Sequence, residues 1–127
     1  MTQNRWGLFA GIVGAALLAL PLYAHHAGSL YDREHPVTMT GTVTKYLFTN
    51  PHVAIHYEVK DEAGNVEQWV AESAPPQRLY RAGWNTKTLK PGDQITITGG
   101  PSKDGRKYMS VKKLVGPDWQ SLTQGAE

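Results

Sequence analysis

The 127-residue sequence contains no cysteine. This absence excludes disulfide bonds, thiolate metal sites, cysteine nucleophiles and lipid attachment at a cysteine. A domain without disulfides must be stabilised by its core alone, so we expect a closed barrel rather than a loop-rich fold. The length suffices for one domain and is too short for two separate cores.

Motifs typical of hydrolases and phosphoryl-transfer enzymes are also missing. The sequence has no glycine-rich phosphate loop, no zinc-protease His-Glu-x-x-His pattern and no paired-carboxylate motif. Its central region holds only three serines, Ser73, Ser102 and Ser110, and none lies in a nucleophile elbow. The sequence therefore favours a binding protein over an enzyme.

A long uncharged run lies near the N-terminus. Arg5 precedes residues 6–20, which carry no charge, and residues 22–24 read Leu-Tyr-Ala. A short basic region, an apolar region and a small-residue end are the three parts of a secretory signal peptide. The alternative is an uncleaved membrane anchor, although about 15 apolar residues are short for a span of about 20. We expect a signal peptide over residues 1–24, a periplasmic or secreted protein, and no membrane span after cleavage.

The mature chain would be nearly neutral, because the signal peptide removes only Arg5 from 13 basic and 11 acidic side chains. This balance gives no general reason to expect binding to nucleic acid or to an anionic membrane. We expect the partner to be a small ligand, a metal ion or a periplasmic protein.

Alternation of apolar and polar residues predicts five strands. The segments are 37–44, 53–59, 66–72, the surroundings of Ile95 and Ile97, and 107–115. Gly41 suggests a bulge or a tight bend in the first of them. In segment 66–72 either face could be the buried one, since apolar residues occur on both.

A short helix is predicted between the third and fourth strands. Ser73 could cap it, Pro75-Pro76 suits its first turn, and Gly83 would end it, with Trp84 packing back. Three strands, a helix and two strands is the element order of the OB fold, with a small sandwich as the alternative. We predict an all-β, five-stranded OB-like barrel over residues 37–116. An extended arm at 25–36 would precede it, and a flexible tail at 117–127 would follow.

All five histidines follow the predicted cleavage point; they are His25, His26, His35, His52 and His56. Cleavage would give His25 a free α-amine beside its imidazole, and together these groups can chelate a metal ion. Nitrogen ligands in a tetragonal arrangement suit Cu(II) and Ni(II). We predict a copper-type site built from His25, His26 and one of the other three. The alternative is a polar arm that is simply well solvated.

His52 and His56 would not share one ion, because four residues along a strand span roughly 13 Å. His52 follows Asn50-Pro51 and could satisfy backbone groups in a turn. His56 lies on the predicted outer face with Glu58, which could orient its ring, or it could be solvated.

Two further groups of side chains allow binding functions. Six aromatic residues could stack on sugars or bases, or could form the core, which we favour: Tyr46, Phe48, Tyr57, Trp69, Tyr80 and Trp84. Five basic residues could attract anions, or could protect an edge strand from pairing, which we also favour: Lys103, Arg106, Lys107, Lys112 and Lys113. Alternatives to a metal-binding module are therefore a copper-dependent oxidative enzyme and oligosaccharide or oligonucleotide binding on the barrel face.

Several short motifs recur in one known group of proteins. They are His25-His26, Tyr31-Asp32, residues 37–43, Thr49-Asn50-Pro51-His52, the Trp69 strand, Arg81-Ala82-Gly83-Trp84 and Leu89-Lys90-Pro91-Gly92-Asp93. On these motifs the chain resembles, over nearly all of residues 25–115, a family of exported bacterial proteins known only as a domain of unknown function. The resemblance implies export and an OB-like barrel, and it implies no established activity.

Overall fold

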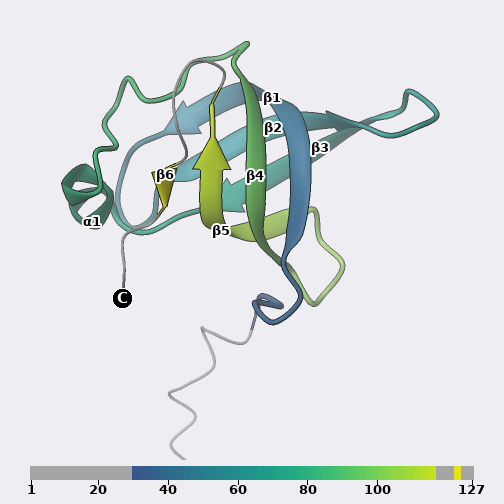
Figure 1. Cartoon of the computed structure of the whole chain (residues 1–127), viewed down its shortest axis with the longest axis horizontal. Coiled ribbons are helices and arrows are strands. Elements are labelled where there is room, and N and C mark those ends of the chain that lie inside the picture. Colours follow the sequence, from purple (N-terminus) through teal and green to yellow (C-terminus); the bar gives the residue numbers. More distant parts are fainter. Residues whose placement is uncertain (1–29, 117–121, 124–127) are drawn as a thin grey trace, which may run out of the picture.

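The computed structural model describes residues 30–116 and 122–123. The predicted signal peptide, His25, His26 and most of the predicted tail lie outside these residues. The described elements, shown in Figure 1, are β1 (Val37–Leu47), β2 (Ala54–Lys60), β3 (Val66–Glu72), α1 (Pro76–Arg81), β4 (Gln94–Pro101), β5 (Tyr108–Val115) and β6 (Leu122–Thr123). Within the described residues, no helix is long and apolar enough to cross a membrane.

The five long strands close into a barrel. Their order is β3-β2-β1-β4-β5, with every neighbour antiparallel, and a parallel pairing of β3 with β5 joins the two ends. α1 lies between β3 and β4 in the chain and to one side of the barrel, opposite the tip of the β2–β3 hairpin (Figure 1). The predicted OB-like barrel is therefore confirmed. The two residues of β6 pair with β5, so the chain returns to the barrel after Gly116.

Threonines line the outer face of β1. Thr38 and Thr40 form hydroxyl hydrogen bonds to Thr98 and Thr96 of β4, at 2.9 and 3.0 Å. Gly41 faces inward where a Cβ atom would lie 2.5 Å from the carbonyl oxygen of Glu58, so a side chain there would clash with β2. The bulge itself lies further along β1, between Val43 and Lys45.

The core settles which face of β3 is buried. Trp69 and Ala71 point inward and pack with Ile55 and Tyr57 of β2. Of the six aromatic residues, Tyr57, Trp69 and Trp84 are buried core members, and Tyr46 and Phe48 pack against the core. The core interpretation is wrong only for Tyr80, which is 65% exposed.

The start of α1 differs from the prediction. Its N-cap is Pro75, without a side-chain capping bond, and Ser73 is buried with no hydrogen-bond partner for its hydroxyl among the described residues. The physical reason is that segment 73–74 pairs with Val53 through two backbone hydrogen bonds, so it belongs to the barrel wall and precedes the helix. The end matches the prediction: Gly83 has a φ of 91°, and the Trp84 N–H donates to the Leu79 carbonyl at 3.0 Å.

The edge-strand interpretation of the basic residues is wrong. β5, which carries Lys112 and Lys113, pairs with β4 on one side and with β3 and β6 on the other. The prediction failed because the closing contact with β3 is parallel and joins distant parts of the sequence. Lys103, Arg106 and Lys107 lie in the β4–β5 loop.

Candidate functional site

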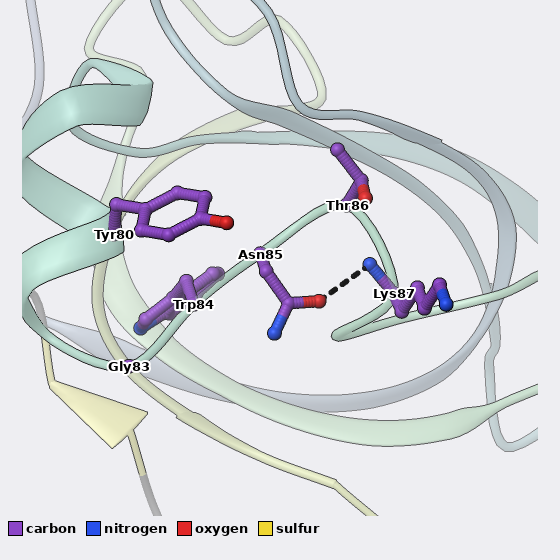
Figure 2. A pocket seen from close by; sticks show the side chains of 6 residues that line it. All are labelled: Tyr80, Gly83, Trp84, Asn85, Thr86 and Lys87. Carbon is purple, nitrogen blue, oxygen red and sulfur yellow. Dashed lines mark hydrogen bonds between the residues drawn. The ribbon is translucent and has the colours of Figure 1, made fainter.

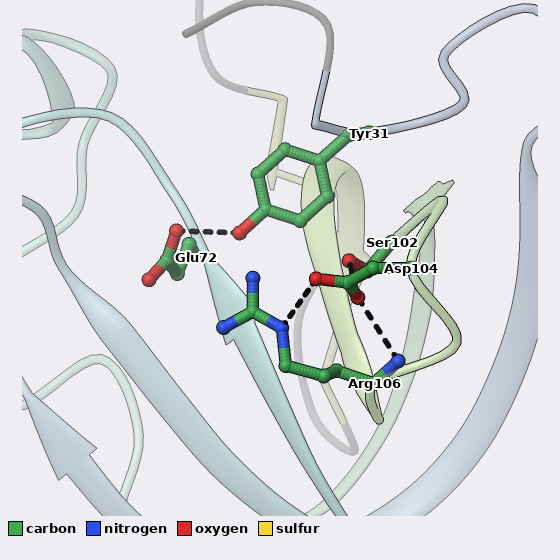
Figure 3. A network of polar contacts seen from close by, with 5 residues as sticks. All are labelled: Tyr31, Glu72, Ser102, Asp104 and Arg106. Atoms are coloured by element: carbon green, nitrogen blue, oxygen red, sulfur yellow. Dashed lines mark hydrogen bonds and ion pairs between the residues drawn. The ribbon is translucent and has the colours of Figure 1, made fainter.

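The described part of the arm, residues 30–36, is bound to the barrel. Tyr31 forms an isolated bridge with Ser102, and the Asp32 N–H donates to the Pro101 carbonyl at 2.8 Å. The Tyr31 hydroxyl donates to a carboxylate oxygen of Glu72 on β3 at 2.6 Å (Figure 3). Burial, with the Glu72 contact adding to it, raises the pKa of the Tyr31 phenol, so the hydroxyl keeps its proton. The arm is therefore held by both backbone and side-chain contacts.

The β4–β5 loop beside the arm is tied together by charge. Asp104 accepts hydrogen bonds from the Ser102 hydroxyl and from the Arg106 Nε, both at 2.6 Å. These bonds lower the pKa of Asp104 to about 2, with the Ser102 bond as the largest cause. Figure 3 shows the Arg106 guanidinium between the carboxylates of Asp104 and Glu72. Nearby, Lys107 pairs with Glu67 at 2.9 Å and lowers the pKa of that carboxyl.

The outer face of β2 and β3 is the surface on which OB folds typically bind oligonucleotides and oligosaccharides. In this protein its outward positions include Glu58 and Glu72 and no aromatic residue. Glu58 accepts a hydrogen bond from Gln68 at 2.6 Å, and Glu72 accepts the bond from Tyr31. This face therefore has no stacking ring, and its charged positions are mixed, because Lys60 lies on it with the two carboxylates.

The described histidines are not gathered at one place. His35 is exposed and pairs with Asp32 at 3.0 Å, and His52 is exposed beside the β1–β2 turn. His56 lies half-buried on the outer face of β2, but the carboxylate expected to orient it, Glu58, instead contacts Gln68. Residues 30–116 contain no group of three His, Cys, Asp or Glu side chains able to hold a metal. A copper-type site would thus depend on His25 and His26, which lie outside the described residues, and it stays a prediction.

A cavity of about 410 Å³ opens beside α1. Its walls come from the end of the helix and the loop that follows, and they consist of Tyr80, Gly83, Trp84, Asn85, Thr86 and Lys87. Figure 2 shows Tyr80 projecting from α1 at one end and Lys87 at the far end of the loop. A volume in this range suits a small ligand or one or two sugar rings.

The loop that forms the cavity is held by its own hydrogen bonds. The Asn85 side-chain oxygen accepts from the Lys87 N–H at 2.7 Å, and the Asn85 N–H donates to the Thr88 hydroxyl at 2.7 Å. From β1, the Tyr46 hydroxyl donates to the Asn85 carbonyl at 3.1 Å. Burial raises the pKa of Tyr46 to about 12, so this donor keeps its proton at neutral pH. The loop is therefore fixed before any ligand arrives.

Tyr80 is exposed, but one side of its ring packs against another aromatic side chain. Its ring meets Phe48 edge-on at 6.1 Å between centroids, and Phe48 contacts Tyr46 at 6.0 Å. Edge-to-face pairs of this kind hold a ring in a defined orientation. The exposed face of Tyr80 is thus a preformed surface for stacking.

Sequence reasoning missed this cavity. The sequence pattern places Tyr80 with the core, and it gives no signal for Asn85, Thr86 or Lys87. The only signal was indirect: Gly83 ends the helix, and a polar loop follows it.

Comparison with solved structures supports the fold. The structure is similar to the mitochondrial single-stranded DNA binding protein Rim1 of S. cerevisiae, with a TM-score of 0.50 and 6% identity over 65% of this chain and 92% of the other. It is also similar to a small single-stranded DNA-binding protein of Streptomyces coelicolor, with a TM-score of 0.46 and 13% identity over 66% of this chain and 93% of the other. At such identities the likeness concerns the fold alone.

Comparison of sequences places the chain in a family. No curated protein resembles the sequence closely enough to count as a match. Residues 14–110 match the model of a family of unknown function, DUF6152, and this range covers most of the chain. The chain therefore belongs to the family of unknown function DUF6152.

Proposed function

We propose that this protein is an exported binding module that takes a saccharide-type ligand in the cavity beside α1. The observation that carries the proposal is the exposed Tyr80 ring, supported by Phe48 and facing a cavity edged with amide, hydroxyl and ammonium groups. Binding pockets typically combine an aromatic wall with a few fixed polar groups.

The polar groups around Tyr80 suit hydroxyl-rich rings. The side-chain oxygen of Asn85 is engaged by Lys87, which leaves its amide nitrogen directed by that bond and able to donate. Thr86 is exposed on the same loop and can both donate and accept. A sugar ring that stacks on Tyr80 would find donors and acceptors for its hydroxyls within the same cavity.

The barrel acts as the rigid support for this site. Trp84 is 1% exposed and joins the core, so the cavity loop is anchored directly to the barrel interior. Sites on rigid supports lose less entropy when a ligand binds. The signal peptide predicted over residues 1–24 supports an exported location, where saccharides are available ligands.

The experiment is a titration of the 15N-labelled mature domain with maltotriose and with trigalacturonate, followed by backbone amide shifts. We expect shifts in residues 80–87 with at least one of these sugars and none in the outer face of β2 and β3. Tyr80→Ala should abolish the shifts. Val66→Ala is the matched control, because Val66 is also an exposed apolar residue but lies on β3.

Two results would overturn the proposal. The first is that neither sugar shifts the amides of residues 80–87. The second is that the sugars shift only the β2–β3 face. Mass spectrometry of the secreted protein tests the export part separately, because a chain beginning at residue 1 would contradict cleavage.

A further inference from the structure

We infer that the ligand of this cavity is an acidic saccharide, in which carboxylate groups accompany the sugar ring; this rests on the binding function proposed above. The first observation is the distribution of charge along the chain. Between Glu72 and Asp93 the sequence has four basic side chains and no acidic one. They are Arg78, Arg81, Lys87 and Lys90. The whole chain has a net charge of only +2, so the remainder is net acidic. The positive charge is concentrated in the segment that builds the cavity.

The second observation is that most of this charge is not neutralised. Lys90 forms an ion pair with Asp93. Within residues 30–116, the side chains of Arg78, Arg81 and Lys87 form no ion pair, and all three are exposed. An unpaired group of one sign around a concave surface raises the local concentration of ions of opposite sign.

The third observation is the placement of charge relative to the ring. Lys87 lines the cavity at the opposite end of the loop from Tyr80 (Figure 2). Arg78 and Arg81 lie on the same short helix as Tyr80. A ligand that stacks on Tyr80 and carries a carboxylate toward Lys87 would use both ends of the cavity. A neutral sugar would offer Lys87 hydroxyl groups only, without an opposite charge.

A single-stranded nucleic acid is also an anion with flat rings, but it fits these features less well. Such ligands are bound through several aromatic side chains along a positively charged groove. Among the described residues Tyr80 is the one aromatic side chain with a largely exposed ring, and the outer face of β2 and β3 bears Glu58 and Glu72. One ring with one polar loop suits a short sugar segment better.

The test compares an acidic trisaccharide, trigalacturonate, with a neutral one, maltotriose, by calorimetry on the mature domain. Because the two sugars also differ in configuration at C4, the salt dependence and the Lys87 variant isolate the contribution of the carboxylates. At about 20 mM NaCl we expect trigalacturonate to bind at least about tenfold more tightly, and the preference to shrink at about 200 mM NaCl. Lys87→Gln should weaken trigalacturonate binding about threefold, as for one exposed charge contact, and leave maltotriose binding unchanged. The triple variant Arg78→Gln, Arg81→Gln, Lys87→Gln should abolish the preference.

Lys112→Gln is the matched control, because Lys112 is an exposed lysine on β5 and does not line the cavity. Equal affinity for the two sugars without salt dependence would overturn the acidic-ligand inference and leave the proposed function standing. Failure of both sugars to bind would overturn both proposals. Tighter binding of a thymidine oligonucleotide, with the same dependence on Lys87, would replace the saccharide with a nucleic acid.

Discussion

Two polar regions of the barrel differ in how their side chains are bonded. The arm side consists of residues 30–36 and the β4–β5 loop, and the α1 side consists of α1 and the cavity residues 83–87. On the arm side the carboxylates of Glu72 and Asp104 have partners: Tyr31 donates to Glu72, and Arg106 pairs with Asp104. On the α1 side the Tyr80 ring and the Lys87 ammonium face outward without such partners among the described residues. Both regions are rich in polar and aromatic side chains, so composition alone does not separate them.

This difference indicates which region is structural and which is available to a ligand. Groups that are already hydrogen-bonded contribute to the stability of the fold, and a ligand would have to replace those bonds. Groups that are fixed in place and exposed, such as the Asn85 side chain, can bond to a ligand at little cost. The protein's own arm thus occupies part of the surface that OB folds usually offer, and the α1 cavity remains open.

The largest expected effect is on the free energy of unfolding, and it should differ between variants of Trp84 and of Tyr80. Trp84→Ala removes a fully buried indole and should lower the free energy of unfolding by about 3–5 kcal/mol. Tyr80→Ala removes an exposed ring with one edge contact and should cost about 0.5–1.5 kcal/mol. Urea denaturation measures both. If the two variants lost equal stability, Tyr80 would belong to the core and the comparison would fail.

Much of the barrel could be predicted because its signals are local. Period-two alternation identified the inward residues of β1 and β2, such as Val43 and Ile55, and Gly83 marked the end of α1. Alternation does not decide which face of β3 is buried, because Val66 and Val70 are as apolar as the residues on its other face. Only closure of the barrel against β5 decides between them.

The candidate site could not be predicted because it depends on distant contacts. Tyr46 supports Asn85 across 39 residues, and Tyr31 reaches Glu72 across 41. Hydrophobic periodicity reports neither contact. The absence of acidic residues between Glu72 and Asp93 was visible in the sequence, but its meaning required knowing that this segment lines a cavity.

A second prediction tests whether the arm is held as firmly as the contacts indicate. Tyr31→Phe removes the donor to Glu72, and a hydrogen bond to a charged group typically contributes about 1.5–3 kcal/mol. Amide hydrogen exchange at Asp32 and Lys103, whose N–H groups bond to Pro101 and Leu30, should accelerate about tenfold or more.

The matched control for the arm is Tyr80→Phe, which should leave exchange at both amides unchanged. Unaltered protection in the Tyr31 variant would mean that the backbone bonds alone hold the arm. If Tyr31→Phe changed sugar binding in the cavity, the arm and the cavity would not act independently.

A third prediction asks whether the arm side has a ligand of its own. If the mature chain begins at His25, Cu(II) should bind, and His25→Ala or His26→Ala should weaken binding more than about tenfold. A Cu(II) titration of the mature protein followed by visible absorbance measures this. Separate alanine variants of His35, His52 and His56 identify any third nitrogen ligand. Unchanged affinity in both arm variants would remove the copper hypothesis.

The smallest expected effect is the contribution of Asp104 to stability at acidic pH. The pKa of Asp104 is lowered to about 2, first by the Ser102 hydroxyl and then by Arg106. Because the folded value lies below the unfolded value of about 3.9, this carboxylate stabilises the fold above about pH 4, and its contribution is lost as the pH falls toward 2.

Other carboxyls also have lowered pKa values, among them Asp93 and Glu67, so the whole protein should lose stability in acid. Comparison with Asp104→Asn isolates the single group. The wild type should melt slightly above the variant near pH 6, and the gap should narrow steadily as the pH falls from about 4 toward 2. The cavity wall contains no carboxylate, so Asp104→Asn should leave trigalacturonate affinity at neutral pH unchanged. A gap that persists in acid would show that the Asn side chain changes the loop by means other than charge.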